Sequence, residues 1–116
     1  MLSRFLTKVL FTAIASLFIS YLLKGVYIDS IRTALILAIV LALLNNFIKP
    51  LLIILTLPIT LVTLGLFLLV INILIIKWAS SLVAGFRVDG WWSALLFSLL
   101  LSFLTSVIER VVGNKK

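Results

Sequence analysis

The residues best suited to chemistry in this sequence gather around two prolines near its centre. Asn45 and Asn46 precede Lys49 in the run NNFIKP, within an otherwise apolar stretch. Amides donate and accept hydrogen bonds, and a lysine ammonium binds anionic groups such as lipid phosphates. The candidate functional and lipid-contact residues are Asn45, Asn46, Lys49, Pro50, Thr56, Pro58, Thr60 and Thr63. A plainer interpretation stays open for Lys49, whose ammonium can extend to the membrane surface.

The side chains that most often carry catalysis are missing or isolated. The sequence has no Cys and no His, and it has only three acidic residues. Glu109 and Arg110 stand together at the end of an apolar segment, where an interface or an ion pair explains them. No combination of nucleophile, base and oxyanion donor emerges. The sequence therefore predicts that the protein is not an enzyme, has no cofactor and binds no metal.

The composition identifies the solvent around these residues as lipid. Of 116 residues, 65% are hydrophobic and 11% are charged. A soluble domain of this length is about half apolar and a quarter charged, so it could not bury so much apolar surface. The net charge is +7, but no basic cluster is interleaved with aromatics, which argues against nucleic acid. The expected partners of the basic residues are anionic lipid headgroups.

Four apolar segments predict an all-α integral membrane protein with one domain over residues 1–116. They cover about 5–23, 31–48, 51–83 and 91–112. Each can cross ~30 Å of hydrocarbon at ~1.5 Å per residue. The connections between them are short, so neighbouring helices are expected to form antiparallel hairpins. The first segment begins like a signal peptide but is not followed by a small-x-small cleavage site, so it is expected to be retained.

The basic residues predict the orientation of this four-helix arrangement. One side carries Arg4, Lys8, Lys49, Arg110, Lys115 and Lys116, and the other carries Lys24, Arg32, Lys77 and Arg87. The positive-inside rule places both termini in the cytoplasm. All the Tyr and Trp fall on the other side, where amphipathic rings favour the headgroup level: Tyr21, Tyr27, Trp78, Trp91 and Trp92.

The third apolar segment is too long to be one straight spanning helix. Between Lys49 and Lys77 there is no charged residue, and a helix of that length would measure about 40 Å. Pro58 lacks an N–H and disfavours helical dihedrals at Leu57, so it predicts a break there. The piece before Pro58 is either a kinked first turn or a shallow re-entrant segment. Threonine hydroxyls on both sides of the break are expected to satisfy the backbone groups that it frees.

Small residues at four-residue spacing predict how the helices pack. Lipid tails are as apolar as Leu, so close backbone contact and hydrogen bonds hold membrane helices together. The predicted packing residues are Ala34, Ala38, Ala42, Gly65, Asn72, Ala94, Ser98, Ser102 and Ser106. Thr12, Ser16 and Ser20 give the first helix a similar stripe. An alternative is that the serine stripe of the last helix lines a polar path in an oligomer. No internal repeat is expected.

The central residues carry a family resemblance. The run NFIKPLLIILTLPITLVTLGLF, followed by Asn72, resembles the YvlD-like bacterial membrane proteins, also described as the four-helix phage holin superfamily IV. Gly85, Phe86, Gly90 and Trp91 match the family pattern in the third connection. The resemblance covers nearly the whole chain, and it implies a small inner-membrane protein. Some members lie near envelope-stress genes.

Three functions fit these observations. The first is a structural or partner-binding component of the envelope, acting as a homo-oligomer, with another membrane protein as a further partner. The second is a holin-like protein that forms pores or permeabilises the membrane, which would require oligomers because four short helices leave no lumen. The third is binding or transport of a lipid or small solute at the broken helix. The first is the preferred interpretation.

Overall fold

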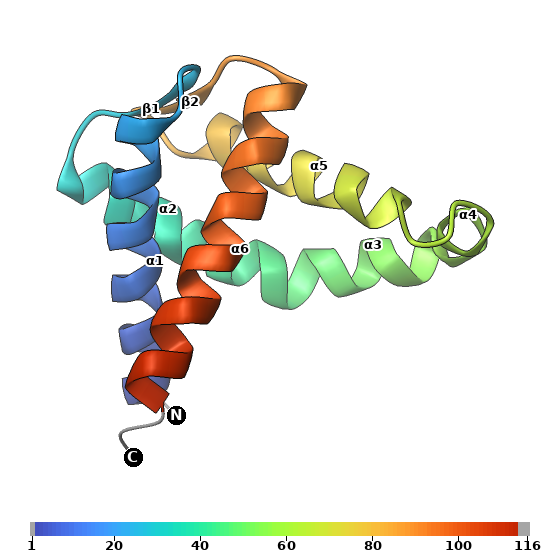
Figure 1. Cartoon of the computed structure of the whole chain (residues 1–116), viewed down its shortest axis with the longest axis horizontal. Helices are drawn as coiled ribbons and strands as arrows, with labels where there is room; N and C mark the ends of the chain where they lie inside the picture. Colours follow the sequence, from blue (N-terminus) through green and yellow to red (C-terminus); the bar gives the residue numbers. More distant parts are fainter. Residues whose placement is uncertain (1, 114–116) are drawn as a thin grey trace.

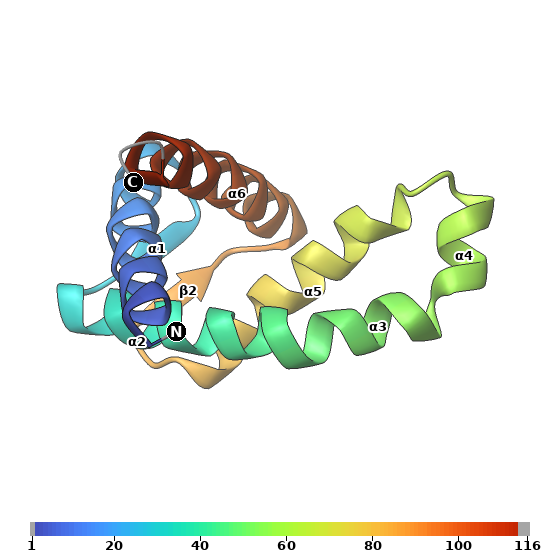
Figure 2. The same cartoon turned by 90° about the horizontal axis from the view of Figure 1, so that it is seen from below.

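The structure is a computed structural model that describes residues 2–113. Its elements, in chain order, are α1 (Leu2–Leu22), β1 (Val26–Ile28), α2 (Ile31–Leu43), a π-helical turn (Leu44–Ile48), α3 (Lys49–Leu55), α4 (Leu57–Val62), α5 (Phe67–Leu82), β2 (Phe86–Val88) and α6 (Trp91–Gly113). Figure 1 shows two arms that meet at the short β-ribbon: α1 with α6, and α2–α3 with α5. Helix α4 forms the tip of the second arm (Figure 2). Lys115 and Lys116, used for the predicted orientation, lie outside the described residues.

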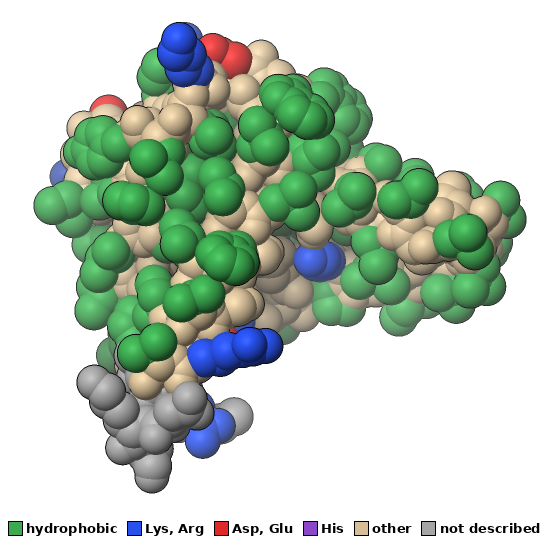
Figure 3. Space-filling model, viewed as in Figure 1, with side chains coloured by type: hydrophobic (Ala, Val, Ile, Leu, Met, Phe, Trp, Pro, Cys, Tyr) green, Lys and Arg blue, Asp and Glu red, His purple; other side chains and the backbone are tan. Residues whose placement is uncertain are grey.

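The predicted class, an all-α integral membrane protein, is confirmed. Three helical segments are long and apolar enough to cross a membrane: Ser3–Leu22, Ile31–Leu55 and Trp91–Val111. Helix α5 is a shorter apolar helix of 16 residues. Hydrophobic side chains cover most of the visible surface in Figure 3, as expected where lipid is the solvent.

A two-stranded antiparallel ribbon joins the first and third connections of the chain. Val26 pairs with Val88, Tyr27 with Arg87, and Ile28 with Phe86. Sequence patterns did not predict these strands, because each has only three residues. The ribbon brings together two connections that were both assigned to the same side of the membrane. The hairpins are therefore tied to each other at this end of the molecule.

The turn predicted at residues 45–50 is wrong, because the helix that begins at Ile31 continues to Leu55. The backbone N–H of Lys49 donates to the carbonyl of Leu44, which closes a wider π-helical turn just before Pro50. Proline lacks an N–H and its ring crowds the preceding turn of an α-helix. Opening that turn relieves the crowding, and π-bulges are a recurrent response to such local conflicts. The piece placed at 51–57 therefore ends the second helix and does not begin the third.

The break predicted near Pro58 is present, and it forms the real turn between the second and third helices. The helix ends at Thr56, and α4 follows at a different angle before α5 begins (Figure 2). After α4, Leu64 N–H donates to Leu61 O (3.2 Å) and Gly65 N–H donates to Thr60 O (2.8 Å). These two bonds form a Schellman motif with Leu64 at the left-handed position, φ 58°.

The two hairpins are related by an approximate two-fold axis that no sequence pattern predicted. Residues sixty positions apart are equivalent, so α1, β1 and α2 correspond to α5, β2 and α6. Asp29 N–H donates to Gly85 O (3.1 Å), and its equivalent Asp89 N–H donates to Gly25 O (2.7 Å). The axis passes between Tyr27 and Arg87, which are equivalent and face each other. The expectation of no internal repeat is therefore wrong.

The core follows the same symmetry. Equivalent pairs are buried together, as shown by Ala34 with Ala94 and by Leu37 with Phe97, all four at 0% exposure. Phe97 also packs against Phe86 in a tilted arrangement, with ring centroids 5.4 Å apart. The repeat is not visible as sequence identity, because many equivalent core positions hold different apolar residues. Such exchanges keep the position buried.

Candidate functional site

A polar cleft lies between the arms, on the side away from the β-ribbon. Its larger lobe encloses about 270 Å³ and is lined by Phe5, Lys8, Val9, Thr12, Ala38, Leu41, Ala42, Asn45, Asn46, Leu101, Ser102, Thr105, Ser106 and Glu109. Its smaller lobe, about 50 Å³, is lined by Leu41, Asn45, Lys49, Asn72, Ile75, Ile76, Ser98, Leu101 and Ser102. The lobes share four lining residues, so we treat them as one site and call it the polar cleft.

The internal two-fold axis exchanges the two lobes. The larger lobe lies between α1, α2 and α6, and the smaller lobe lies between α5, α6 and α2. Thr12 of the larger lobe is equivalent to Asn72 of the smaller one. Leu41 and Leu101, which line both lobes, are equivalent to each other. The polar cleft is thus built at the interface between the repeats, where sites also lie in transporters made of related halves.

The second helix supplies its polar residues through the π-helical turn. Asn45 and Asn46 lie inside this turn, and Lys49 follows it directly. Asn45 contributes to both lobes, Asn46 to the larger and Lys49 to the smaller. Pro50 is exposed beside them and does not line the cleft. Its role is to impose the wide turn that carries the two amides.

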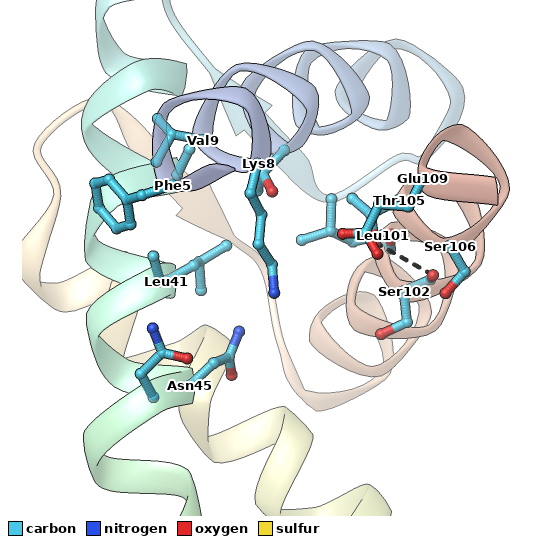
Figure 4. Close-up of a pocket in the computed structure, with 14 residues that line it drawn as sticks. Phe5, Lys8, Val9, Leu41, Asn45, Leu101, Ser102, Thr105, Ser106 and Glu109 are labelled. Carbon is cyan, nitrogen blue, oxygen red and sulfur yellow. Dashed lines mark hydrogen bonds between the residues drawn. The ribbon is translucent and has the colours of Figure 1, made fainter. Parts of the chain in front are cut away.

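Helix α6 supplies hydroxyls and one carboxylate from the opposite wall. Figure 4 shows Ser102, Thr105, Ser106 and Glu109 on α6, with the Lys8 side chain extending into the space between α6 and the wall that carries Asn45. Thr105 Oγ1 donates to Leu101 O at 2.8 Å, so its proton is used within the helix. Its oxygen retains capacity to accept a bond from a ligand.

The charged and amide groups of the cleft have no partners within the described part of the chain. There, the one ion pair is Arg87 with Asp89 (3.6 Å), at the opposite end of the molecule. Neither lysine of the cleft nor Glu109 forms a pair among residues 2–113. The side chains of the three cleft asparagines make no hydrogen bond with any described residue. Lys49 and Asn72 are half-buried, whereas the other charged and amide groups of the cleft, Lys8, Asn45, Asn46 and Glu109, are exposed. The cleft therefore presents free polar groups to a polar ligand.

The candidate residues near the second proline lie elsewhere. Thr56, Pro58, Thr60 and Thr63 are at the tip of the second arm, and none of them lines the cleft. Thr56 Oγ1 donates to Leu52 O (2.7 Å), and Thr63 Oγ1 accepts from Phe67 N–H (3.2 Å) at the start of α5. These bonds serve the backbone at the break. The sequence-predicted set therefore divides into a cleft group and a turn group.

The predicted packing residues also divide. Ala34 and Ala94 are buried between helices, and Ala38 and Ser98 are buried at the inner edge of the cleft. The other three, Ala42, Ser102 and Ser106, line the cleft further along the same faces. Asn72 faces the second and last helices across the smaller lobe, without a hydrogen bond to a described residue. Gly65 is not a packing residue: it lies in the turn after α4 with φ 90°, and nothing would lie within 4 Å of an added Cβ.

Lys8 and Glu109 are the cleft residues that sequence reasoning did not assign to a site. Lys8 was interpreted as an orientation signal and Glu109 as a helix-end residue. The sixty-residue correspondence contains a signal for Glu109, because it pairs Lys49 with Glu109 and Asn46 with Ser106. It contains none for Lys8, whose equivalent is Leu68. Equivalent positions lie at the same depth in the membrane, so this alignment places the polar residues of both hairpins at one level.

The fold and the cleft define a class: a small multi-pass helical membrane protein with a polar site at the interface of two repeated hairpins. The family described as mycobacterial four-transmembrane phage holin, superfamily IV, matches residues 3–107, and this chain belongs to it. The uncharacterised membrane protein YvlD of Bacillus subtilis is 39% identical over 104 residues, covering 89% of this chain and 87% of the relative. The protein SCO3922 of Streptomyces coelicolor is 36% identical over 86 residues, covering 71% and 69%. No solved structure matches this chain.

Proposed function

We propose that this protein binds the headgroup of a membrane phospholipid in the polar cleft. The supporting observation is the cleft itself, where two lysines and three amides lack partners among residues 2–113 and lie between helices with apolar outer faces. A phospholipid supplies what such a site lacks: a phosphate for the ammonium groups and acyl chains for the surrounding apolar surface. The cleft is open, so a headgroup reaches it from the leaflet on the side away from the β-ribbon.

That leaflet is the cytoplasmic one in the orientation that we propose for a bacterial inner membrane. The cleft end of the molecule carries Lys8, Lys49 and Arg110, together with the start of α1 and the end of α6. Cytoplasmic loops and helix ends carry the excess of basic residues in membrane proteins. Tyr27 and the two tryptophans at the start of α6 are exposed at the ribbon end, at the level expected for the outer headgroups.

Lipid binding gives a specific form to the envelope role expected from the sequence, in which the protein acts as an oligomer and contacts anionic lipids. The pore-forming alternative gains less support. The serine stripe was considered as a lining between copies of the chain, but Ser98 and Ser102 line the cleft of a single chain. Ser98 is also buried, and its hydroxyl donates to Leu95 O at 2.9 Å.

Native mass spectrometry of the full chain in detergent tests the proposed function. Wild type is expected to retain phospholipid after purification, and Lys8→Gln with Lys49→Gln is expected to lose most of it. Lys24→Gln with Arg32→Gln removes an equal charge near the ribbon end and serves as the matched control. Retention that is unchanged in the double variant, or equally reduced in the control, would contradict specific binding in the cleft.

A dye-leakage measurement separates this function from pore formation. Vesicles that contain the protein at high density are expected to keep an encapsulated dye. Leakage that disappears in Ser98→Ala with Ser102→Ala would instead support the holin-like function.

A further inference from the structure

Lys49 and Glu109 occupy equivalent positions in the two repeated hairpins and carry opposite charges. Several other equivalent pairs preserve their character: Thr12 with Asn72 and Asn45 with Thr105 are polar, and Leu41 with Leu101 is apolar. The two lobes nevertheless differ in volume, about 270 and 50 Å³, and in charge. The charge differs at two pairs, Lys49 with Glu109 and Lys8 with Leu68. A site of this kind distinguishes the two ends of a ligand by their charge.

Both charges are available to a ligand. Lys49 lines the smaller lobe and Glu109 the larger, and neither has an ion-pair partner among the residues with described side chains. Lys8 lines the larger lobe on α1 and extends toward the space between the walls (Figure 4). The cleft thus presents two ammonium groups and one carboxylate. A ligand with one negative and one positive group offers a partner to all three charges, the negative group to the lysines and the positive group to Glu109.

We infer that the phospholipid bound in the cleft is zwitterionic, with its phosphate between Lys8 and Lys49 and its ammonium on Glu109. This inference rests on the proposed function and names the class of headgroup, of which phosphoethanolamine is the simplest. The amide nitrogen of Asn45, which contributes to both lobes, is placed to donate to the phosphate.

An ammonium with free N–H groups suits the larger lobe better than a fully methylated one. Glu109 accepts such hydrogen bonds, and the hydroxyl oxygens of Thr105 and Ser106 beside it are additional acceptors. Thr105 Oγ1 already donates to its own helix, so it faces a ligand as an acceptor. A headgroup without an ammonium would leave the carboxylate facing a hydroxyl or a second anion.

The test compares lipids in direct competition. The full chain is purified in detergent and mixed with equal amounts of phosphatidylethanolamine and phosphatidylglycerol, and native mass spectrometry measures the ratio bound. The ammonium of phosphatidylethanolamine can form a charge-assisted hydrogen bond to Glu109, and phosphatidylglycerol cannot. We therefore expect wild type to prefer phosphatidylethanolamine by about tenfold. Glu109→Gln is expected to reduce that ratio to about one, and Glu109→Asp to restore part of it.

Two controls keep this result independent of folding and of the proposed function. Asp89→Asn removes an acidic charge at the ribbon end and is expected to keep the wild-type preference. Phosphatidylethanolamine with an acetylated amine keeps the phosphate but loses the ammonium, and it is expected to compete no better than phosphatidylglycerol with unaltered protein. Equal binding of these lipids by wild type, or a preference for phosphatidylglycerol, overturns the inference while leaving lipid binding intact. If wild type retains neither lipid, the proposed function itself fails.

Discussion

Tyr27 and Arg87 face each other across the β-ribbon, with the guanidinium carbon 4.2 Å from the centre of the tyrosine ring. The internal two-fold axis passes between them, and the two residues hold equivalent positions in the two hairpins. The two residues differ in type, and the difference permits a cation–π contact that two identical side chains could not form. Arg87 also pairs with Asp89, but this surface ion pair is well exposed and contributes little.

A double-mutant cycle between Tyr27 and Arg87 measures this contact. Tyr27→Leu and Arg87→Gln are each expected to lower the free energy of unfolding, with a coupling of about 0.5–1 kcal/mol because the pair is exposed. Thermal unfolding in detergent gives the values. Zero coupling would show that the cation–π contact does not contribute to the stability of the fold. The same cycle between Arg87 and Asp89 is expected to give a smaller coupling.

The ribbon also predicts a disulfide in a chain that has no cysteine. Val26 and Val88 are paired and largely buried, and their flanking bonds make them a non-hydrogen-bonded pair, in which side chains approach closely. Val26→Cys with Val88→Cys is expected to form an intramolecular disulfide under mild oxidation, detected as a mobility shift that a reductant reverses. Each single variant is the control. Failure to cross-link would contradict the pairing of the two connections.

Gly85 and Gly65 form a matched pair for testing the contact with Asp29. Both have positive φ, 92° and 90°, so alanine is strained at either position. A Cβ on Gly85 would also collide with the Asp29 carboxylate, whereas nothing lies near one on Gly65. Gly65→Ala is expected to lower the free energy of unfolding in detergent by about 1 kcal/mol, and Gly85→Ala is expected to lower it clearly more. Equal losses would show that Asp29 moves away freely.

Leu64 offers a stabilising substitution. It holds a left-handed conformation, φ 58°, and is 92% exposed, so its side chain has few contacts to lose. Leu64→Gly removes a conformational cost of about 1 kcal/mol and is expected to raise the unfolding temperature. Leu61 is also exposed and lies in the preceding helical turn. Leu61→Gly is expected to lower the free energy of unfolding by a similar amount, about 1 kcal/mol, and so to lower the unfolding temperature. A loss of stability in Leu64→Gly would indicate that this side chain has a packing role.

The sequence was sufficient for the class and for the break at Pro58, because both depend on composition and on a residue with a strong local effect. It misplaced the turn between the second and third helices. Pro50 and the amides before it are typical of a helix end, and nothing local shows that a π-helical turn carries the chain through. The middle of the cleft was found through Asn45, Asn46 and Lys49. Its other wall was missed because it depends on how α1 and α6 pack against the second helix.

The Schellman turn after α4 is the one connection that has no counterpart under the sixty-residue correspondence, since it links the repeats instead of belonging to either. Each hairpin on its two sides contains a complete strand and half of the cleft. A chain cut between Leu64 and Gly65 would therefore leave two fragments of similar architecture that pair like the subunits of a two-fold dimer. Seen this way, the protein is a heterodimer of two hairpins joined by a covalent link, and its two halves can differ in cleft charge as two identical subunits could not.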